Sequence, residues 1–484
     1  MKKYKKNRSS FSPPRPAFLI LVLLLVLSGC EEKASKEATP SAPKPADVKP
    51  LEINLQETKL AAITGDYDKT ANIFFSLSGR QAGYVAWKEG KQFVVVGDRP
   101  GASYDAVWTD TIAVSRDGQR IAYSGKREGK WYIVLDGKEG EPYENTGSII
   151  FSPDGRLMSC EVKDKGSWFI VVYDGDKEVY RSQAYHDSFR PPVFSPDGGL
   201  LVYELGDRDK KRVVFFLDVA GRKLVKKRVY DDLGIAGKFS FSSDFSRIAY
   251  EAAKEGKFFL VLQDLLLNEE RTISVPEMMQ GTVLLSPNGK KIAYLESKAG
   301  EQFLAMSPWE SPLERTEMGP YEAINVPVFS PDSMTVAFQA LKQGKWLSVI
   351  GDREAAANYD GIDTPVFSPD GTKIAYPAMK KGRFFMIVSP VDRPDAVREG
   401  PVYDMAVTPV FSPDSRRVAY RARKGPMEKA KRFIVIADAE KGRRVKQGTP
   451  GDEIWPPVFS PDGRSVGYGA KIGHELWWKV QLLP

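Results

Sequence analysis

Histidine, the side chain that most often binds metals or moves protons in enzymes, is rare in this chain. Two histidines occur in 484 residues. His186 stands in AYHDSF and His474 in KIGHELWW, and neither has a second histidine at the spacing of a zinc-binding helix. The sequence has no Gly-x-Ser-x-Gly nucleophile segment and no nucleotide-binding glycine pattern. It therefore predicts no catalytic residue, no metal site and no cofactor.

A tyrosine followed by an acid is the one repeated feature whose chemistry suits ligand binding. An aromatic ring with a polar tip beside a carboxylate can contact a sugar face, a basic peptide or a cation. The alternative is that the tyrosine packs in the core and the acid caps a turn. The pairs are Tyr67-Asp68, Tyr104-Asp105, Tyr143-Glu144, Tyr230-Asp231, Tyr321-Glu322, Tyr359-Asp360 and Tyr403-Asp404, with Asp187 and Asp452-Glu453 at similar places.

The elements that position these pairs come from an internal repeat. A phrase like FSPDGTKIAY recurs at intervals of roughly 40 residues, the period of propeller blades. Its first residue falls at Phe75, Val114, Phe151, Phe194, Phe241, Leu285, Phe329, Phe367, Phe411 and Phe459. Ten copies fill the chain from residue 51 to 484, so we expect one repeat domain over that range.

Each copy predicts four short antiparallel strands. In the copy from residue 364, Pro-Val-Phe is the first strand, and Ser-Pro-Asp-Gly is a tight turn in which Gly371 takes a positive φ. A second strand at 373–376, a polar tip at 380–383, an apolar third strand at 384–388 and a weaker fourth strand follow. Phe245, Ser333 and Ser415 replace the glycine in three copies, where we expect looser turns or turns of another type.

Prolines predict which strand lies at the edge of each sheet. Pro192, Pro327, Pro365, Pro409 and Pro457 all stand just before the expected first strand. A proline cannot donate a hydrogen bond to a neighbouring strand, so the first strand should be the edge that lines a central channel.

The two ends of the repeat domain predict how the ring closes. The last copy ends at its third strand, and LEINLQETKLAAITGDYD before the first copy reads as an isolated fourth strand. We therefore expect this N-terminal strand to complete the last blade and to remove the exposed edges of an open array. The predicted fold is all-β: a β-propeller of about ten four-stranded blades in one closed ring.

The repeated phrase FSPDGxxIAY resembles the repeat of TolB-type propellers, which are related to Trp-Asp repeat propellers. The resemblance covers almost all of the chain after residue 50. Ten copies exceed the usual four to eight blades of a propeller. The family includes lyases with histidine-rich metal sites, and this sequence does not match such a site.

The N-terminus resembles that of a bacterial lipoprotein. Basic residues and then the apolar run 17–29 are typical of a secretory signal, and the run is shorter than the roughly 20 residues that cross a membrane. Leu27-Ser28-Gly29-Cys30 resembles a lipobox, which implies that residues 1–29 are removed and that Cys30 carries a diacylglycerol anchor. Glu31 stands where an aspartate tends to mark retention in the inner membrane, so the resemblance favours the outer membrane and the periplasm.

Residues 30–50 comprise this cysteine and a flexible tether rich in Lys, Glu, Ala and Pro. With Cys30 lipidated, Cys160 has no disulfide partner, and we expect it to be a buried, unreactive thiol. Removal of the signal peptide would remove six of the 70 basic residues, so the numbers of basic and acidic residues in the mature chain, with 63 acidic residues, would be nearly equal. That balance predicts no nucleic-acid partner.

Two classes of function remain open. The first is a non-catalytic scaffold, held on the membrane through Cys30, that binds a protein or a cell-envelope polymer. The second is a propeller enzyme or a binder of a glycan or peptide that uses the central channel. In both, the Tyr-acid loops should form an acidic, aromatic mouth on one face, inside a rim of lysine-rich tips such as 88–91 and 380–383.

Overall fold

The computed structural model describes residues 51–233, 239–265, 267–275, 283–355, 359–426 and 430–483. The predicted signal peptide (1–29), Cys30 and the tether up to residue 50 lie outside these ranges. The described residues all belong to one compact unit. In the described ranges all regular structure is β, and no helix there is long and apolar enough to cross a membrane.

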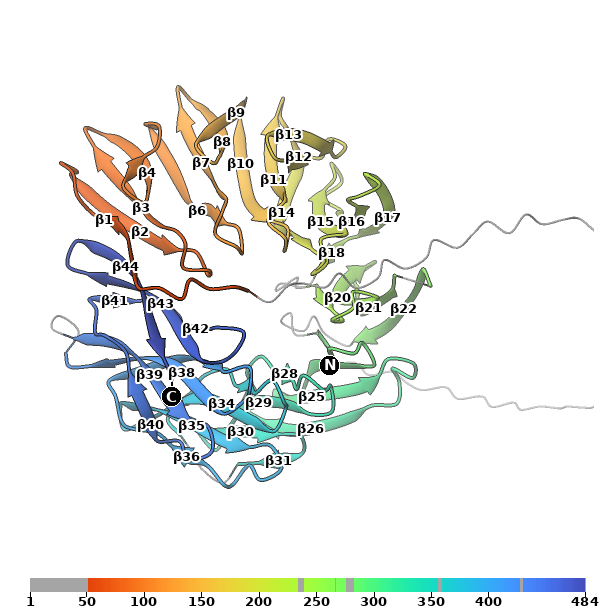
Figure 1. Cartoon of the computed structure of the whole chain (residues 1–484). Helices are drawn as coiled ribbons and strands as arrows, with labels where there is room; N and C mark the ends of the chain where they lie inside the picture. The colour runs from red at the N-terminus through yellow and green to blue at the C-terminus, as the bar shows by residue number, and fades with distance from the viewer. Residues whose placement is uncertain are drawn as a thin grey trace, which may run out of the picture. The chain divides into compact units, whose positions relative to one another are not determined.

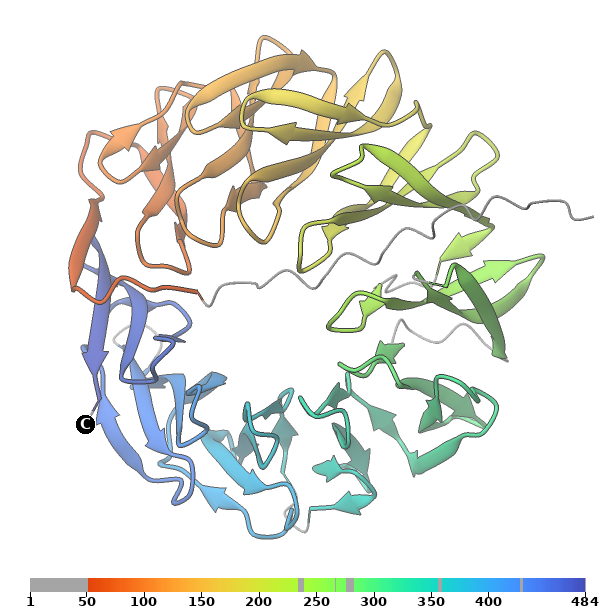
Figure 2. The ribbon, with the colours of Figure 1, turned by 45° about the vertical axis from the view of Figure 1, so that its right-hand side comes forward.

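Ten antiparallel sheets form a ring, which confirms the predicted propeller of ten blades (Figures 1 and 2). Blade 1 contains β2 (Lys69–Phe75), β3 (Ala82–Lys88), β4 (Lys91–Val96) and β5 (Arg99–Pro100). Blade 2 contains β6 (Ala106–Val114), β7 (Ile121–Arg127), β8 (Lys130–Leu135) and β9 (Lys138–Tyr143). Blade 3 contains β10 (Asn145–Phe151), β11 (Leu157–Asp164), β12 (Ser167–Asp174) and β13 (Lys177–Arg181). Blade 4 contains β14 (Asp187–Phe194), β15 (Leu200–Gly206), β16 (Arg212–Asp218) and β17 (Lys223–Tyr230). Blade 5 contains β18 (Asp232–Leu233), β19 (Ser240–Phe241), β20 (Arg247–Lys254), β21 (Lys257–Asp264) and β22 (Glu269–Val275).

The second half of the ring repeats this order. Blade 6 contains β23 (Leu284–Leu285), β24 (Lys291–Lys298), β25 (Glu301–Pro308) and β26 (Thr316–Tyr321). Blade 7 contains β27 (Ala323–Ile324), β28 (Val328–Phe329), β29 (Val336–Lys342), β30 (Lys345–Ile350) and β31 (Arg353–Glu354). Blade 8 contains β32 (Gly361–Ile362), β33 (Val366–Phe367), β34 (Lys373–Lys380), β35 (Arg383–Pro390) and β36 (Arg398–Glu399). Blade 9 contains β37 (Met405–Phe411), β38 (Arg417–Lys424), β39 (Lys431–Asp438) and β40 (Arg444–Gln447). Blade 10 contains β41 (Glu453–Ile454), β42 (Val458–Phe459), β43 (Ser465–Ile472), β44 (Glu475–Leu482) and β1 (Thr58–Ala62).

The first strand of each blade is an edge strand, as the prolines predicted. First strands of several neighbouring blades contact one another, as β10 does with β6 and β14, and fourth strands such as β22, β26 and β31 run along the outside of the ring (Figure 1). The expectation that the first strand begins after the proline is wrong. In blade 8, Pro365 separates β32 from β33, and both pieces pair with β34. In blade 9, Pro409 lies at a register shift between Val407 and Val410. The proline therefore marks a bulge, where no ladder hydrogen bond is required.

The N-terminal strand closes the ring, which confirms the predicted clasp. β1 pairs antiparallel with β44, with Thr58 opposite Trp478. Trp478 is 2% exposed, packs with Ile53, and donates from Nε1 to the Asn54 carbonyl (2.8 Å). Lys59 forms an ion pair with Glu475 (2.7 Å) across the same strands. Blade 10 therefore contains four strands from the end of the chain, β41 to β44, and one strand from its start.

The Ser-Pro-Asp-Gly phrase forms the turn between the first and second strands. In blade 8, Ser368 Oγ donates to Asp370 Oδ1 (2.6 Å) and accepts from the Lys373 N–H (2.9 Å). Asp370 Oδ1 also accepts from the Thr372 N–H (3.0 Å), so the expected turn role of this aspartate is confirmed. The serine is buried in every copy: Ser76, Ser115, Ser152, Ser195, Ser242, Ser286, Ser330, Ser368, Ser412 and Ser460.

Three turns without glycine keep the same geometry, so the expectation of looser or different turns is wrong. Phe245, Ser333 and Ser415 have φ of 57°, 65° and 59°, the left-handed values that glycine adopts in the other copies. New contacts accompany the replacements. Phe245 stacks on Phe241 with ring centroids 4.1 Å apart. Ser415 Oγ accepts from the Asp370 N–H of the neighbouring blade (3.1 Å).

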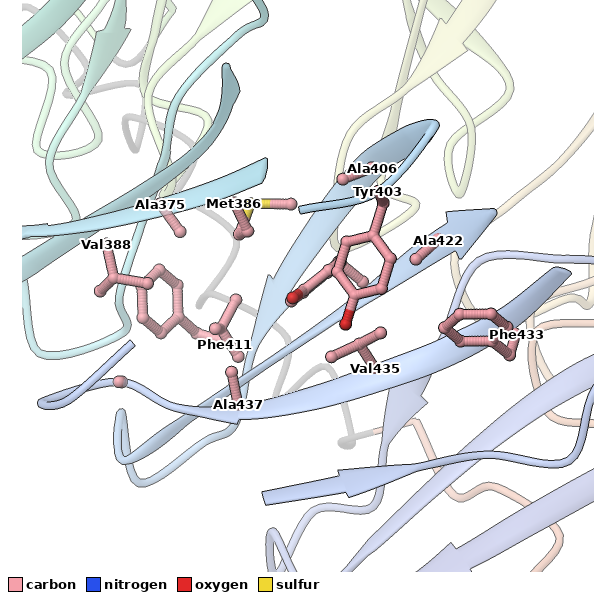
Figure 3. Close-up of a cluster of buried hydrophobic side chains, with 13 residues drawn as sticks. Ala375, Met386, Val388, Tyr403, Ala406, Phe411, Ala422, Phe433, Val435 and Ala437 are labelled. Carbon is pink, nitrogen blue, oxygen red and sulfur yellow. The ribbon is translucent and has the colours of Figure 1, made fainter. Parts of the chain in front are cut away.

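The core lies between blades. Each of ten buried clusters joins two neighbouring sheets, including one between blades 10 and 1 that contains Ala61, Tyr84 and Leu476. Figure 3 shows the cluster between blades 8 and 9, where the Tyr403 ring lies near Ala422 and Val435. Because both faces of each sheet are covered, second and third strands are apolar along most of their length.

Candidate functional site

The tyrosines of the Tyr-acid loops are part of this core. Tyr104, Tyr143, Tyr230, Tyr321, Tyr359 and Tyr403 are at most 6% exposed, and Tyr67 is half-buried. Four of these rings, those of Tyr104, Tyr230, Tyr321 and Tyr403, meet an aromatic residue of the same interface edge to face, for example Tyr403 with Tyr420 at 6.2 Å. Burial, together with the hydrogen bond to Glu139 (2.7 Å), raises the pKa of the Tyr104 hydroxyl. A ligand on this surface would meet the acids and not these six rings.

The acids of the loops fasten the hairpin tips between second and third strands. Asp68 Oδ2 accepts from the Glu89 N–H (3.0 Å), and Glu144 Oε2 accepts from the Gly166 N–H (2.9 Å). Glu322 makes the same contact with Gly344 at 3.3 Å. Since each acid bonds a tip of its own blade, loops and tips share one face of the ring, as the sequence predicted.

Four of the acids also bridge two blades. Asp404 accepts from the Gly425 N–H of blade 9 (2.8 Å) and forms an ion pair with Arg383 of blade 8 (2.7 Å). The same double contact occurs at Asp105, Asp231 and Asp360, whose partners in the preceding blade are Lys91, Lys211 and Lys345. The hydrogen bond from Lys345, and then that from the Lys381 main chain, lowers the pKa of Asp360. At these four places, each acid of a loop is therefore paired with a basic side chain of the preceding blade.

The residues considered for metal or nucleophilic chemistry lie apart. His474 is exposed at the tip between β43 and β44, and exposed His186 contacts the neighbouring Asp187 (3.1 Å). Cys160 is fully buried, and burial raises the pKa of its thiol, as expected for an unreactive cysteine. The described ranges contain no group of three or more His, Cys, Asp or Glu side chains placed to hold a metal ion.

A pocket of about 400 Å³ opens between blades 9 and 10. Its walls are Met405, Arg421, Ala422, Arg432, Asp452, Glu453 and Ile454. At the interface between blades 8 and 9, Tyr403 of the loop forms an isolated β-bridge with Phe384 of the third strand. At the interface between blades 9 and 10, the residue in that place is Gly451, which forms the β-bridge with Arg432. The interface therefore lacks the aromatic ring that occupies this part of its neighbour.

Arg421 is the functional candidate that the Tyr-acid pattern did not reveal. It follows the tyrosine of the second strand, and the equivalent residues are Val85, Ser124, Glu161, Glu204, Glu251, Leu295, Gln339, Pro377 and Gly469. It is thus the one cation at this position of the repeat, a signal that a copy-by-copy alignment could have found.

Comparisons with known proteins assign this chain to no family. No family model matches the chain, and no curated protein matches its sequence. Similar solved structures include a eukaryotic initiation factor (13% identity, TM-score 0.48, covering 75% of this chain and 93% of that one). TolB from Acinetobacter baumannii has 14% identity and a TM-score of 0.30, covering 63% and 80%. A β-propeller domain from Myceliophteria thermophila has 14% identity and a TM-score of 0.32, covering 62% and 98%. Similarity at this level identifies no activity, and membership of the TolB-type repeat family stays a prediction.

Proposed function

We propose that the mature protein is a lipid-anchored propeller that binds a protein or a cell-envelope polymer on one face of its ring and catalyses no reaction. Cys30 would carry the lipid, and residues 31–50 would let the ring stand off the membrane. The proposed location is the periplasmic side of the envelope, on the outer membrane.

The observation that carries this proposal is the fastening of the hairpin tips. A main-chain N–H in the tip of a blade is held by a carboxylate of the loop before it, as in Asp68 with Glu89 and Asp404 with Gly425. Side chains displayed on fixed tips lose little conformational entropy when a partner binds. The tips carry exposed charges, such as Lys381 in blade 8 and Glu128 in blade 2, which suit a polar partner surface.

The anchor is tested by replacing the cysteine. Cys30→Ser should abolish incorporation of labelled fatty acid and move the protein from the membrane fraction to the soluble fraction, because a diacylglycerol would be missing. If the native protein takes up no label and the variant stays with the membrane, the anchor proposal fails.

The binding face is tested with a photo-crosslinking amino acid at the two ends of β34. Position 381 lies in the tip beside the Tyr-acid loops, and position 372 lies in the turn at the other end; both residues are exposed. Irradiation in cells should give a crosslinked product from position 381 and none from position 372. Equal products from both positions would contradict a one-faced scaffold. A substrate or small ligand in the central channel, the alternative from the sequence, would leave both positions without a crosslinked macromolecule.

A further inference from the structure

The pocket between blades 9 and 10 contains a cation whose partner is missing from the described part of the chain. Arg421 donates from Nε to Thr408 Oγ1 (3.0 Å) and from Nη1 to the Ile454 carbonyl (3.2 Å). These contacts use two of the five N–H donors of its guanidinium. Among the described residues, no carboxylate lies within 4.0 Å of it. Burial, with no opposing charge, lowers the pKa of Arg421.

Blade 4 shows how the chain satisfies an arginine in the same surroundings. There Arg190 donates to the Leu233 carbonyl (3.3 Å), as Arg421 does to Ile454. Glu204, at the position equivalent to Arg421, is fully buried and forms ion pairs with Arg190 (3.3 Å) and Arg212 (3.5 Å). A partly buried guanidinium without a carboxylate is costly, and a bidentate carboxylate is its best partner. Among the described residues of blade 9 and its neighbour, no carboxylate takes this place beside Arg421, so a ligand can supply it.

The other walls of the pocket select the ligand. Asp452 and Glu453 also line it, and Arg432 Nη1 donates to the Asp452 carbonyl. Asp452 Oδ2 accepts from the Gly473 N–H (2.7 Å), and Glu453 lies 3.5 Å from Lys471. These two carboxylates repel a simple anion and attract an ammonium group. A volume of about 400 Å³ is in the range of small-molecule sites and is too small for a folded partner.

We propose that this pocket binds a small zwitterion, an α-amino acid in its simplest form. The carboxylate would pair with Arg421, and the ammonium group would lie toward Asp452 and Glu453. The site goes beyond the proposed scaffold role and does not depend on it, since a ligand could bind here whatever contacts the tips.

The test is calorimetric titration of the mature protein with the common α-amino acids, with acetate and methylamine as probes that carry one charge each. At least one amino acid should bind, and more tightly than either single-charge probe. Arg421→Gln should weaken that binding about tenfold or more, because a charge-assisted bidentate contact is lost. Arg393→Gln, at an exposed arginine outside the pocket, should leave the affinity unchanged.

A second measurement separates a ligand contact from a structural role. Without ligand, Arg421→Gln should melt at the same temperature as the native protein or higher, since it removes an unpaired and partly buried charge. An amino acid should raise the melting temperature of the native protein and not that of the variant. The proposal is overturned if no amino acid binds, if acetate binds as tightly, or if Arg421→Gln binds as well as the native protein.

Discussion

Single carboxylates connect neighbouring parts of this ring at defined atoms. Asp360 accepts from the Lys381 N–H of its own blade (2.7 Å) and pairs with Lys345 of the blade before it. Asp404 repeats this bridge one blade further on. The contacts lie at the surface, where ion pairs add little stability one by one, so each bridge is worth most through its main-chain hydrogen bond.

Replacing Asp360 and Asp404 together by Asn tests whether the acids serve the fold or a ligand. We expect a lower melting temperature, by about 2–4 °C, because two hairpin tips lose a charged acceptor and two bases lose their partner. Asp352→Asn, at an exposed turn on the outer side of blade 7, is the control. If melting is unchanged and affinity for a crosslinked partner falls instead, the acids form the binding surface predicted from the sequence.

The turn carboxylates predict how stability depends on pH. Burial tends to raise the pKa of Asp370, but hydrogen bonds from Ser368 and Thr372 outweigh it and lower the pKa to about 2. The pKa values of Asp332, Asp414 and Asp462 are lowered as well. Because the unfolded value is about 3.9, their stabilisation is complete above that pH and is lost as the pH falls through the folded values.

Melting temperature should therefore be nearly level from about pH 7 to pH 5 and fall between about pH 4 and pH 2. Circular dichroism melts measure this directly. Asp370→Asn should be less stable at neutral pH and should show a smaller further loss in acid. A native protein whose stability stays level down to about pH 2 would show that these hydrogen bonds do not act through the charged form.

At the scale of the element, the turn between first and second strands is the most regular part of a blade. A buried serine hydroxyl lies between the aspartate and the N–H of the residue that starts the second strand. The same hydrogen bonds form in turns that lack the proline or the glycine of the phrase. In blade 5, which lacks both, Ser242 Oγ accepts from the Arg247 N–H (3.0 Å). The hydroxyl and the carboxylate, more than the glycine, therefore hold the turn together.

Ser368→Ala should lower the free energy of unfolding by about 1–3 kcal/mol, since the part-buried Lys373 N–H loses its acceptor and the Asp370 carboxylate loses one of its donors. Urea unfolding gives the value. Ser297→Ala, at an exposed serine of β24, should change it by less than about 0.5 kcal/mol. Equal losses in the two variants would contradict a special role of the turn serine.

For the whole molecule, stability depends on contacts between neighbours around the ring. Ten buried clusters each join two blades, and the cluster of blades 10 and 1 includes Ala61, which comes from the N-terminal strand. A ring built in this way has no exposed sheet edge between its first and last blades. Removal of β1 would open that interface and uncover β44.

Deleting residues 51–66 should lower the melting temperature by more than about 10 °C, because a strand pairing and the cover of Trp478 are lost together. Deleting tether residues 32–48 is the matched control of similar length and should leave melting unchanged. If the two truncated proteins melt at the same temperature, the N-terminal strand does not hold the ring closed.

The sequence alone determined the features that depend on local rules. A repeated turn phrase, strand-length apolar runs and prolines on one strand predicted ten blades, their strand order and the closing strand, because hairpin geometry is set by residues close in the chain. Only the tertiary structure decided what lies between blades. Between the blades, the Tyr403 ring is buried in the core and Asp404 forms an ion pair with the preceding blade. Ser415 accepts a hydrogen bond from the turn of the neighbouring blade, and Arg421 lines a pocket. These contacts join residues about 20 to 45 positions apart on separate sheets, and no local pattern specifies which side chain meets which.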